Sequence, residues 1–133
     1  MTKLEATIQE YSEAVDNFEE ILKRREDPRS LDYAIIRDSA IKRFELAFDM
    51  SWKVVKAWLE EKGTICVSPL DCFREAYRGG IIEYQDVWTR VVKTRNKTAH
   101  VYKEKLAEEV YSELPEFLAA FQDLKNYFTK NQP

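Results

Sequence analysis

Several residue types are scarce in this chain of 133 residues, and each scarcity excludes a class of fold or site. Three glycines and four prolines argue against a β sandwich or barrel with many turns and favour a few long elements. No apolar run approaches the ~18 residues that a membrane span needs, and the N-terminus lacks a signal-peptide pattern, so we expect no membrane association. The length suits one core, and we expect a single helical domain over residues 1–133.

Cysteine and histidine are also rare, since the chain has two cysteines and one histidine. Cys66 and Cys72 do not form a C-x-x-C pair, and together with His100 they do not make a zinc site within one chain. We therefore expect no metal and no cofactor. We interpret the two cysteines as reduced thiols of a cytoplasmic protein.

Apolar residues recur at spacings of three and four through most of the chain, which predicts amphipathic helices. We expect helices over residues 3–25, 31–61, 68–78, from about 83, and 103–130. Asp27 and Pro28 separate the first two, because proline lacks the N–H group and disfavours helix in the preceding residue. Pro115 lies inside the last helix, where the apolar spacing continues in phase, so we predict a kink rather than a break.

The helix expected over residues 31–61 has an apolar arc of roughly 160°, wider than one neighbouring helix requires. Such a helix contacts two partners, which suggests the bundle core on one side and a subunit interface on the other. Arg37 projects into this arc, and Glu45 lies at its edge as a second candidate buried charge. Two interpretations of Arg37 stay open. Its stem packs while its head reaches water, or it is a cation held for a phosphate or a partner carboxylate.

Residues 90–105, RVVKTRNKTAHVYKEK, gather the chemistry that the rest of the chain lacks, and we call them the basic segment. The segment contains His100 and one acid, Glu104. Its cations are Arg90, Lys93, Arg95, Lys97, Lys103 and Lys105. The local formal charge is therefore +5, in a chain whose net charge is −3. If the chain has a chemical site, we expect it here.

Arg95 continues the apolar stripe of the fourth helix, eleven residues after Tyr84. His100 follows five residues later, and on an unbroken helix the two side chains would lie ~140° apart. Either the helix ends between them, near residues 97–98, or the site is shared between two subunits; the two are compatible.

An arginine and a histidine without metal ligands suit one reaction in particular. Carboxylates with metal-ligand spacing are absent from the basic segment, which argues against a metal-dependent nuclease. RNA cleavage needs no metal, because the 2′-hydroxyl attacks the adjacent phosphorus while an imidazole moves protons and a guanidinium stabilises the phosphorane oxygens. One histidine does not easily serve as both base and acid, whereas a two-fold dimer would bring two. The ordinary alternative is a solvated basic helix end with a packed or capping histidine.

Residues 95–102, RNKTAHVY, resemble the R-x4-6-H motif of the HEPN superfamily and its R-x4-H-x-Y variant. Residues 37–45, RDSAIKRFE, with 51–53, SWK, resemble the second helix of one branch of that superfamily. This branch is the nucleotidyltransferase substrate-binding proteins, which overlap the HepT toxins of HepT/MntA toxin–antitoxin pairs. The phrase AYRGGII at residues 76–82, followed by Trp88, fits the same branch.

The resemblance implies an all-α up-and-down bundle of four to five helices that forms a homodimer. It also implies a partner, a minimal nucleotidyltransferase of the MntA antitoxin type encoded beside it. In the toxin interpretation Arg95 and His100 are the ribonuclease pair, Asn96 is their polar neighbour, and Tyr102 accepts AMP from the partner. Binding of RNA would then rest on the cations of the basic segment: Arg90, Lys93, Lys97, Lys103 and Lys105.

Two other functions stay open. One is a non-catalytic subunit that presents substrate to a two-component nucleotidyltransferase, and the other is a plain helical adaptor. The chain has no Gly-Ser…Asp-x-Asp signature and no P-loop, so it is not itself the transferase. His100 favours the nuclease, because a binding module has no need of an imidazole there.

Overall fold

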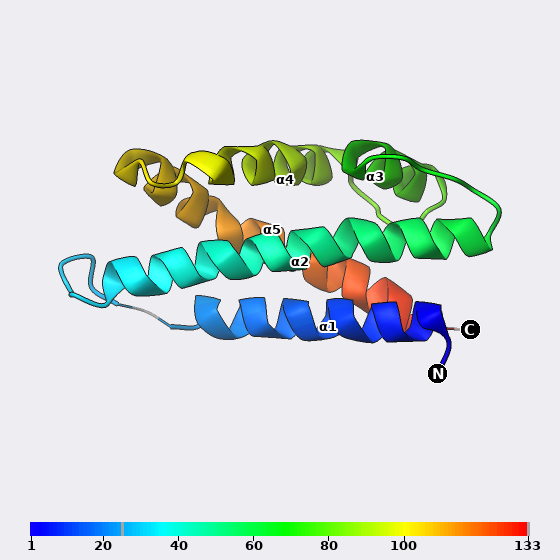
Figure 1. Ribbon diagram of the computed structural model, residues 1–133, viewed down its shortest axis with the longest axis horizontal. Helices are drawn as coiled ribbons and strands as arrows, with labels where there is room; N and C mark the ends of the chain where they lie inside the picture. Colours follow the sequence, from blue (N-terminus) through cyan, green and yellow to red (C-terminus); the bar gives the residue numbers. More distant parts are fainter. Residues whose placement is uncertain (25, 133) are drawn as a thin grey trace.

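The computed structural model describes residues 1–24 and 26–132, and in these residues it contains α-helices and one 3₁₀ turn but no strand (Figure 1). The elements in chain order are α1 (Lys3–Leu22), α2 (Tyr33–Glu61), α3 (Pro69–Arg78), α4 (Gln85–Lys97), the 3₁₀ turn η1 (Thr98–His100) and α5 (Glu104–Lys130). The prediction of an all-α bundle of four to five helices is confirmed. No helix in the described ranges is long and apolar enough to cross a membrane.

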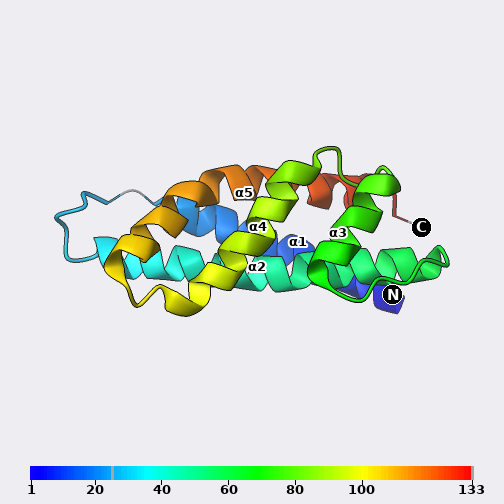
Figure 2. The same cartoon turned by 90° about the horizontal axis from the view of Figure 1, so that it is seen from above.

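Three long helices form the centre of the bundle. α1 lies antiparallel beside α2, and α5 crosses behind both of them (Figure 1). The shorter α3 packs on α2 and α4, and α4 packs on α5 and α2, on the side of α2 opposite to α1 (Figures 1 and 2). α2 therefore contacts neighbours on two sides within the chain. The subunit interface that its wide apolar arc suggested stays a prediction.

An aromatic cluster joins the three long helices at their crossing. The ring of Phe44 on α2 stacks on Phe117 and Phe121 of α5, with centroid distances of 5.6 and 5.9 Å. Phe18 of α1 packs at 6.1 Å from the Phe44 ring and 5.9 Å from the Phe121 ring. All four rings are buried, and each contributes about 1.5–3 kcal/mol of burial free energy. This aromatic cluster lies within the hydrophobic core that the apolar spacings predict.

Helix ends differ from the sequence prediction where no packing supports the terminal residues. α1 ends at Leu22, because Ile21 takes the last buried position and Leu22 is only partly covered. The predicted end, Arg25, lies outside the described residues. α2 begins at Tyr33 rather than residue 31, since Leu31 is 95% exposed and gains nothing from a helical conformation. α4 begins at Gln85 rather than residue 83.

α5 runs through Pro115 without a break, as predicted. Leu114 and Phe117 on either side of the proline are fully buried, so the packing of α5 on the core keeps its phase. The kink itself stays a prediction.

The interpretation of the cysteines as reduced thiols is wrong in this structure, because a disulfide joins Cys66 to Cys72. The loop after α2 turns back at Ser68, which caps α3 by accepting a hydrogen bond from the Asp71 backbone N–H. This return places the two Cα atoms 5.0 Å apart, within the range that a disulfide spans. The predicted cytoplasmic location loses the support that free thiols lent to it.

Candidate functional site at the junction of α4 and α5

The helix ends between the arginine and the histidine of the R-x4-H motif. α4 stops at Lys97, and η1 begins at Thr98 and carries His100 as its last residue. The first alternative predicted from the five-residue spacing is therefore confirmed. The second, a site shared between subunits, concerns an assembly and stays a prediction.

The guanidinium of Arg95 is held by side chains from two other parts of the chain. Its Nη1 donates to Glu45 Oε2 on α2 at 2.9 Å and to Thr98 Oγ1 on η1, also at 2.9 Å. One turn further along α2, Asp49 Oδ1 lies 3.5 Å from the Arg95 Nε. The Nε is buried and makes no hydrogen bond within the described residues. Arg95 is thus tied to α2 between two carboxylates.

Arg95 borders the buried stripe of α4 and does not continue it, which corrects the sequence prediction. The buried residues of α4 are Trp88, Val91 and Thr94. A threonine can be buried once its hydroxyl is hydrogen-bonded, whereas the charged head of Arg95 needs its carboxylate partners at the edge of the core. Tyr84, the predicted start of the stripe, is 68% exposed, because it caps the helix in an extended conformation and does not follow the helical period.

His100 and Tyr102 are both exposed after the helix end, and their ring centroids lie 6.1 Å apart at an interplanar angle of 73°. Tyr102 is 77% exposed, so its hydroxyl is accessible to a modifying enzyme. A shallow cavity of about 290 Å³ separates Tyr102 from α2. Its lining residues are Asp38, Ile41, Lys42, Glu45, Val101 and Tyr102. Glu45 therefore contacts Arg95 on one side and faces the Tyr102 cavity on the other.

The remaining residues of the basic segment differ in solvent exposure and in ion pairing. Asn96 is exposed on α4. Arg90, however, pairs with Glu113 and Glu116 of α5 and packs over the Phe117 ring. The hydrogen bond to Glu116 raises the pKa of Arg90, so this guanidinium is already engaged. The lysines predicted to bind RNA are all exposed, namely Lys93, Lys97, Lys103 and Lys105.

The interpretation in which the head of Arg37 reaches water is wrong. Arg37 is 3% exposed, and its guanidinium pairs with Glu104 and with Glu108, the latter at 2.8 Å. Asp38 accepts from the Arg37 Nε at 3.0 Å. These bonds, with that to Glu104 first, raise the pKa of Arg37. Arg37 is thus a buried cation paired with carboxylates, in agreement with the second interpretation. These ion pairs connect the beginning of α5 to α2.

Tyr33 completes this attachment and makes it sensitive to pH. Its hydroxyl donates to Glu108 at 2.7 Å, which raises the pKa of Tyr33 to about 12. The same hydrogen bond, and then Arg37, lower the pKa of Glu108. The stabilisation from Glu108 is therefore complete above its ordinary pKa of about 4.3 and is lost as pH falls through the lowered value.

Replacing Tyr33 with phenylalanine is expected to lower the free energy of unfolding by about 1 kcal/mol at pH 7, because one hydrogen bond to a partly exposed carboxylate is lost. The edge-on packing of the ring against Tyr111 is retained. Urea unfolding at a series of pH values from 7 downward measures the effect, and the difference from wild type should shrink as pH falls through the lowered pKa of Glu108. Tyr77→Phe, at a half-exposed tyrosine, is the control. A difference that stays constant over the whole pH series would contradict the assignment.

The sequence pattern missed several members of the site. Thr98 and Asp49 were not singled out, and neither was Glu108. The sequence does contain spacings that place these residues on common helix faces. Glu45 and Asp49 are four residues apart, and Arg95 and Thr98 are three residues apart. Nothing local, however, indicates that the two pairs meet.

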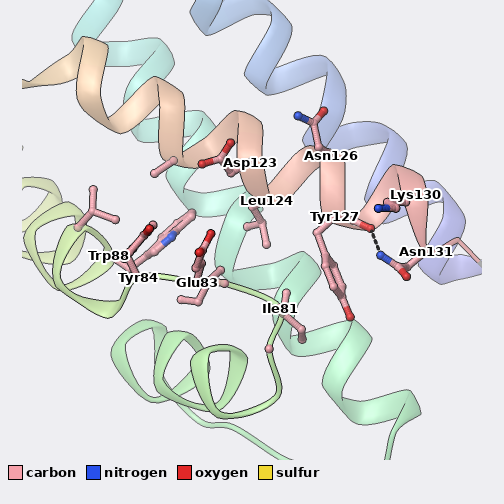
Figure 3. Close-up of a pocket in the computed structure, with 14 residues that line it drawn as sticks. Ile81, Glu83, Tyr84, Trp88, Asp123, Leu124, Asn126, Tyr127, Lys130 and Asn131 are labelled. Atoms are coloured by element: carbon pink, nitrogen blue, oxygen red, sulfur yellow. Dashed lines mark hydrogen bonds between the residues drawn. The ribbon is translucent and has the colours of Figure 1, made fainter.

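A second cavity, of about 500 Å³, lies at the other end of α4, between the α3–α4 connection and the C-terminal half of α5 (Figure 3). Tyr84 and Tyr127 stand at its sides, and Glu83 and Asp123 add carboxylates (Figure 3). Asn131, also at the rim, donates to the Tyr127 carbonyl at 2.8 Å. None of the residues predicted as site residues lines this cavity.

Comparison with known proteins agrees with this fold. The family model described as nucleotidyltransferase substrate binding protein like matches residues 6–130. The probable ribonuclease HepT of Haemophilus influenzae is 31% identical over 94 residues, which cover 64% of this chain and 64% of that protein. The chain thus matches somewhat less than two thirds of the length of this relative.

Two solved structures show the same bundle. A protein from Thermus thermophilus is 29% identical, with a TM-score of 0.77 over 87% of this chain and 96% of the other. The Shewanella oneidensis HEPN toxin, solved in tri-AMPylated form with its MNT antitoxin, is 15% identical, with a TM-score of 0.76 over 98% and 100% of the two chains. At that identity the likeness concerns the fold. With the family model matching nearly its whole length, the chain belongs to the nucleotidyltransferase substrate binding protein like family.

Proposed function

We propose that this chain is a metal-independent endoribonuclease and the toxin of a toxin–antitoxin pair. The observation that carries the proposal is the geometry at the end of α4. Arg95 is held on α2 with a guanidinium edge remaining, and His100 follows on η1 with its imidazole in solvent. The likeness to a probable ribonuclease of the same family supports this assignment.

The reaction is internal transesterification of RNA. His100 takes the proton from a 2′-hydroxyl, the 2′-oxygen bonds to the adjacent phosphorus, and the bond to the 5′-oxygen of the next nucleotide breaks. An imidazolium returns a proton to that leaving oxygen, so the products are a 2′,3′-cyclic phosphate and a 5′-hydroxyl. Arg95 offsets the negative charge that builds on the phosphorane oxygens. Asn96 and the exposed lysines of the basic segment would hold the flanking RNA.

A homodimer supplies the second imidazole that this reaction uses. Each chain has one histidine, so a base and a separate acid require two chains in one cleft. Exposed apolar side chains on α2, Ile35 at 65% and Leu46 at 48% exposure, support a contact between subunits on that helix.

The direct test is RNA cleavage by the purified chain in the presence of EDTA. We expect fragments that end in 2′,3′-cyclic phosphate and 5′-hydroxyl groups, because no metal takes part in the proposed steps. Cleavage that requires Mg²⁺, or fragments with a 5′-phosphate, would refute this mechanism.

The proposed partner is a minimal nucleotidyltransferase of the MntA type, which would silence the toxin by modifying Tyr102. The exposed Tyr102 hydroxyl attacks the α-phosphorus of ATP bound to that partner, AMP is transferred, and pyrophosphate leaves. The modification places a phosphodiester charge and a nucleoside beside His100, where an RNA phosphate would otherwise bind.

Incubation with the partner and ATP is expected to raise the mass of the wild-type chain by one or more AMP groups and to stop RNA cleavage. Tyr102→Phe should gain no mass and keep cleaving RNA after the same incubation. Tyr84→Phe, which removes another exposed tyrosine hydroxyl, should be modified like wild type. Intact-protein mass spectrometry measures the gain, and modification that persists in Tyr102→Phe would reject this acceptor.

A second candidate function is a non-catalytic subunit that presents substrate to a nucleotidyltransferase. The cavity of Figure 3 favours it, because aromatic rings, the carboxylates of Glu83 and Asp123 and the ammonium group of Lys130 suit a small polar ligand. This function requires no RNA cleavage and no role for His100, so the cleavage assay separates the two candidates.

A further inference from the structure

Glu45 occupies a central position in the side-chain contacts at the end of α4. Its Oε2 accepts from the Arg95 Nη1 at 2.9 Å and from the Thr98 hydroxyl at 2.9 Å. The Thr98 hydroxyl also accepts from the same Nη1 at 2.9 Å, so the three groups form a closed triangle. Glu45 is half-buried and Thr98 is 5% exposed, which shields these bonds from exchange with water.

We propose that Glu45 is a positioning residue that orients both Arg95 and the turn that carries His100, with Thr98 as the link between them. The proposal rests on the proposed ribonuclease function and adds to it the group that holds the reacting side chains in place. Glu45 itself does not contact RNA in this scheme.

Holding the Arg95 guanidinium in place before RNA binds favours catalysis. We call Glu45, Thr98 and their hydrogen bonds to Arg95 the clamp. An arginine side chain has several rotatable bonds, and fixing them before substrate arrives removes an entropic cost from the transition state. Glu45 and Thr98 use the Nη1, and the buried Nε faces Asp49. The Nη2 makes no hydrogen bond to any residue in the described ranges, and Arg95 is partly exposed, so this edge is available to a phosphate oxygen.

Thr98 extends the clamp to the histidine. It is the first residue of η1, and His100 is the last residue of that same turn. The single proton of the Thr98 hydroxyl is shared between Glu45 Oε2 at 2.9 Å and the Arg95 backbone carbonyl at 2.7 Å, at the end of α4. The position of η1 relative to α2 is therefore set by the same carboxylate that sets the arginine.

A competing explanation gives Glu45 the opposite effect. Two carboxylates beside one guanidinium leave a local negative charge, which repels a phosphate. If Glu45 acted only through this charge, removing it would strengthen RNA binding and raise activity. Positioning predicts a loss of turnover instead.

Comparing Glu45→Gln with Asp49→Asn separates the two explanations, since both remove one negative charge beside Arg95 from the same helix. Only Glu45 accepts hydrogen bonds from Arg95 and Thr98. We expect Glu45→Gln to lower kcat by at least about tenfold without raising RNA affinity. The amide oxygen accepts from Arg95 and Thr98 only through weaker, uncharged hydrogen bonds, and misplaced catalytic groups lose rate steeply. Asp49→Asn should lower kcat by less than about threefold, since at 3.5 Å it makes no hydrogen bond. Equal gains in kcat/KM for both variants would overturn the proposal.

Two substitutions of Thr98, one without and one with a hydroxyl group, test the link between Glu45 and the turn that carries His100. Thr98→Val removes the hydroxyl and should lower kcat in parallel with Glu45→Gln, whereas Thr98→Ser keeps the hydroxyl and should restore most of the rate. Thermal unfolding of each variant accompanies the kinetics. If Thr98→Ser were as impaired as Thr98→Val, the hydroxyl link would be refuted.

The clamp can be tested apart from catalysis by ¹⁵N NMR of the arginine side chain. In the wild-type chain we expect separate, slowly exchanging Nη signals for Arg95, and in Glu45→Gln we expect them to average through faster rotation. If the wild-type chain shows this signature but no RNA cleavage, the ribonuclease proposal fails while the clamp geometry stands. Averaged Nη signals in the wild-type chain would refute the clamp itself.

Discussion

Replacing His100 with alanine is expected to lower RNA cleavage by at least about 10²-fold, because general acid–base catalysis by one side chain contributes that much or more. Imidazole is the side chain that most often serves as general acid and base in proteins, and His100 is the one histidine of the chain. Its exposure means that the fold does not depend on it. We therefore expect the loss of activity without a matching loss of stability.

The measurement is the initial rate of RNA cleavage in EDTA, together with the thermal unfolding midpoint of each protein. Gln9→Ala, on the exposed side of α1, is a suitable control and should cleave RNA at the wild-type rate. If His100→Ala retains wild-type activity, the assignment of this residue is wrong.

The same variant tests whether the site is shared between subunits. Arg95→Ala and His100→Ala are each expected to be inactive alone, but mixing them should restore part of the activity if one chain supplies the arginine and the other the histidine. Exchange of subunits must be confirmed independently, for example with differently tagged chains. If exchange occurs and activity stays absent, each chain acts alone.

Replacing Phe44 with alanine is expected to lower the free energy of unfolding by about 3–5 kcal/mol, the range for deleting a fully buried aromatic side chain. The Phe44 ring touches α1 through Phe18 and α5 through Phe117 and Phe121. Its removal opens a cavity where the three long helices cross, and it also removes aromatic pairs worth about 0.5–1.5 kcal/mol each.

Urea unfolding followed by circular dichroism measures this loss, with the Cys66–Cys72 disulfide kept oxidised in all samples. Leu31→Ala is the control, because Leu31 is also a large apolar residue but is 95% exposed just before α2, and we expect a change within about 0.5 kcal/mol. A loss below about 1 kcal/mol for Phe44→Ala would show that the core closes around the missing ring.

Local signals in the sequence predicted the helices well, and the reason is physical. Burial of one face repeats every three or four residues, so the spacing of apolar side chains reports a helix wherever that face meets the core. The start of α3 was predicted correctly because Ser68 and Pro69 act through their own backbone. The ends of α1, α2 and α4 were less accurate, since at a helix terminus the outcome depends on whether a neighbour covers the last residue.

The candidate site divides in the same way. Arg95 and His100, with Tyr102 two residues further, were identified because they are close in sequence, and the five-residue step led to the correct prediction of a helix end. The contact of Arg95 with Glu45 joins residues fifty positions apart, and no spacing rule reaches that far. Arg90 shows the reverse error, since a charge that looks free in the sequence pairs with Glu116 on a helix that comes later.

Residue spacing and local motifs were enough to establish that this protein is a helical bundle, that its basic chemistry concentrates in residues 90–105, and that a helix end between Arg95 and His100 was one of two possible arrangements. These features follow from periodicity and from short-range geometry, which each segment carries alone. The packed bundle was needed to establish that α2 supplies Glu45 to Arg95, that Arg37 is buried against the start of α5, and that Cys66 and Cys72 are bonded. Those contacts depend on where helices cross, and the crossing is set by the packing of the whole core.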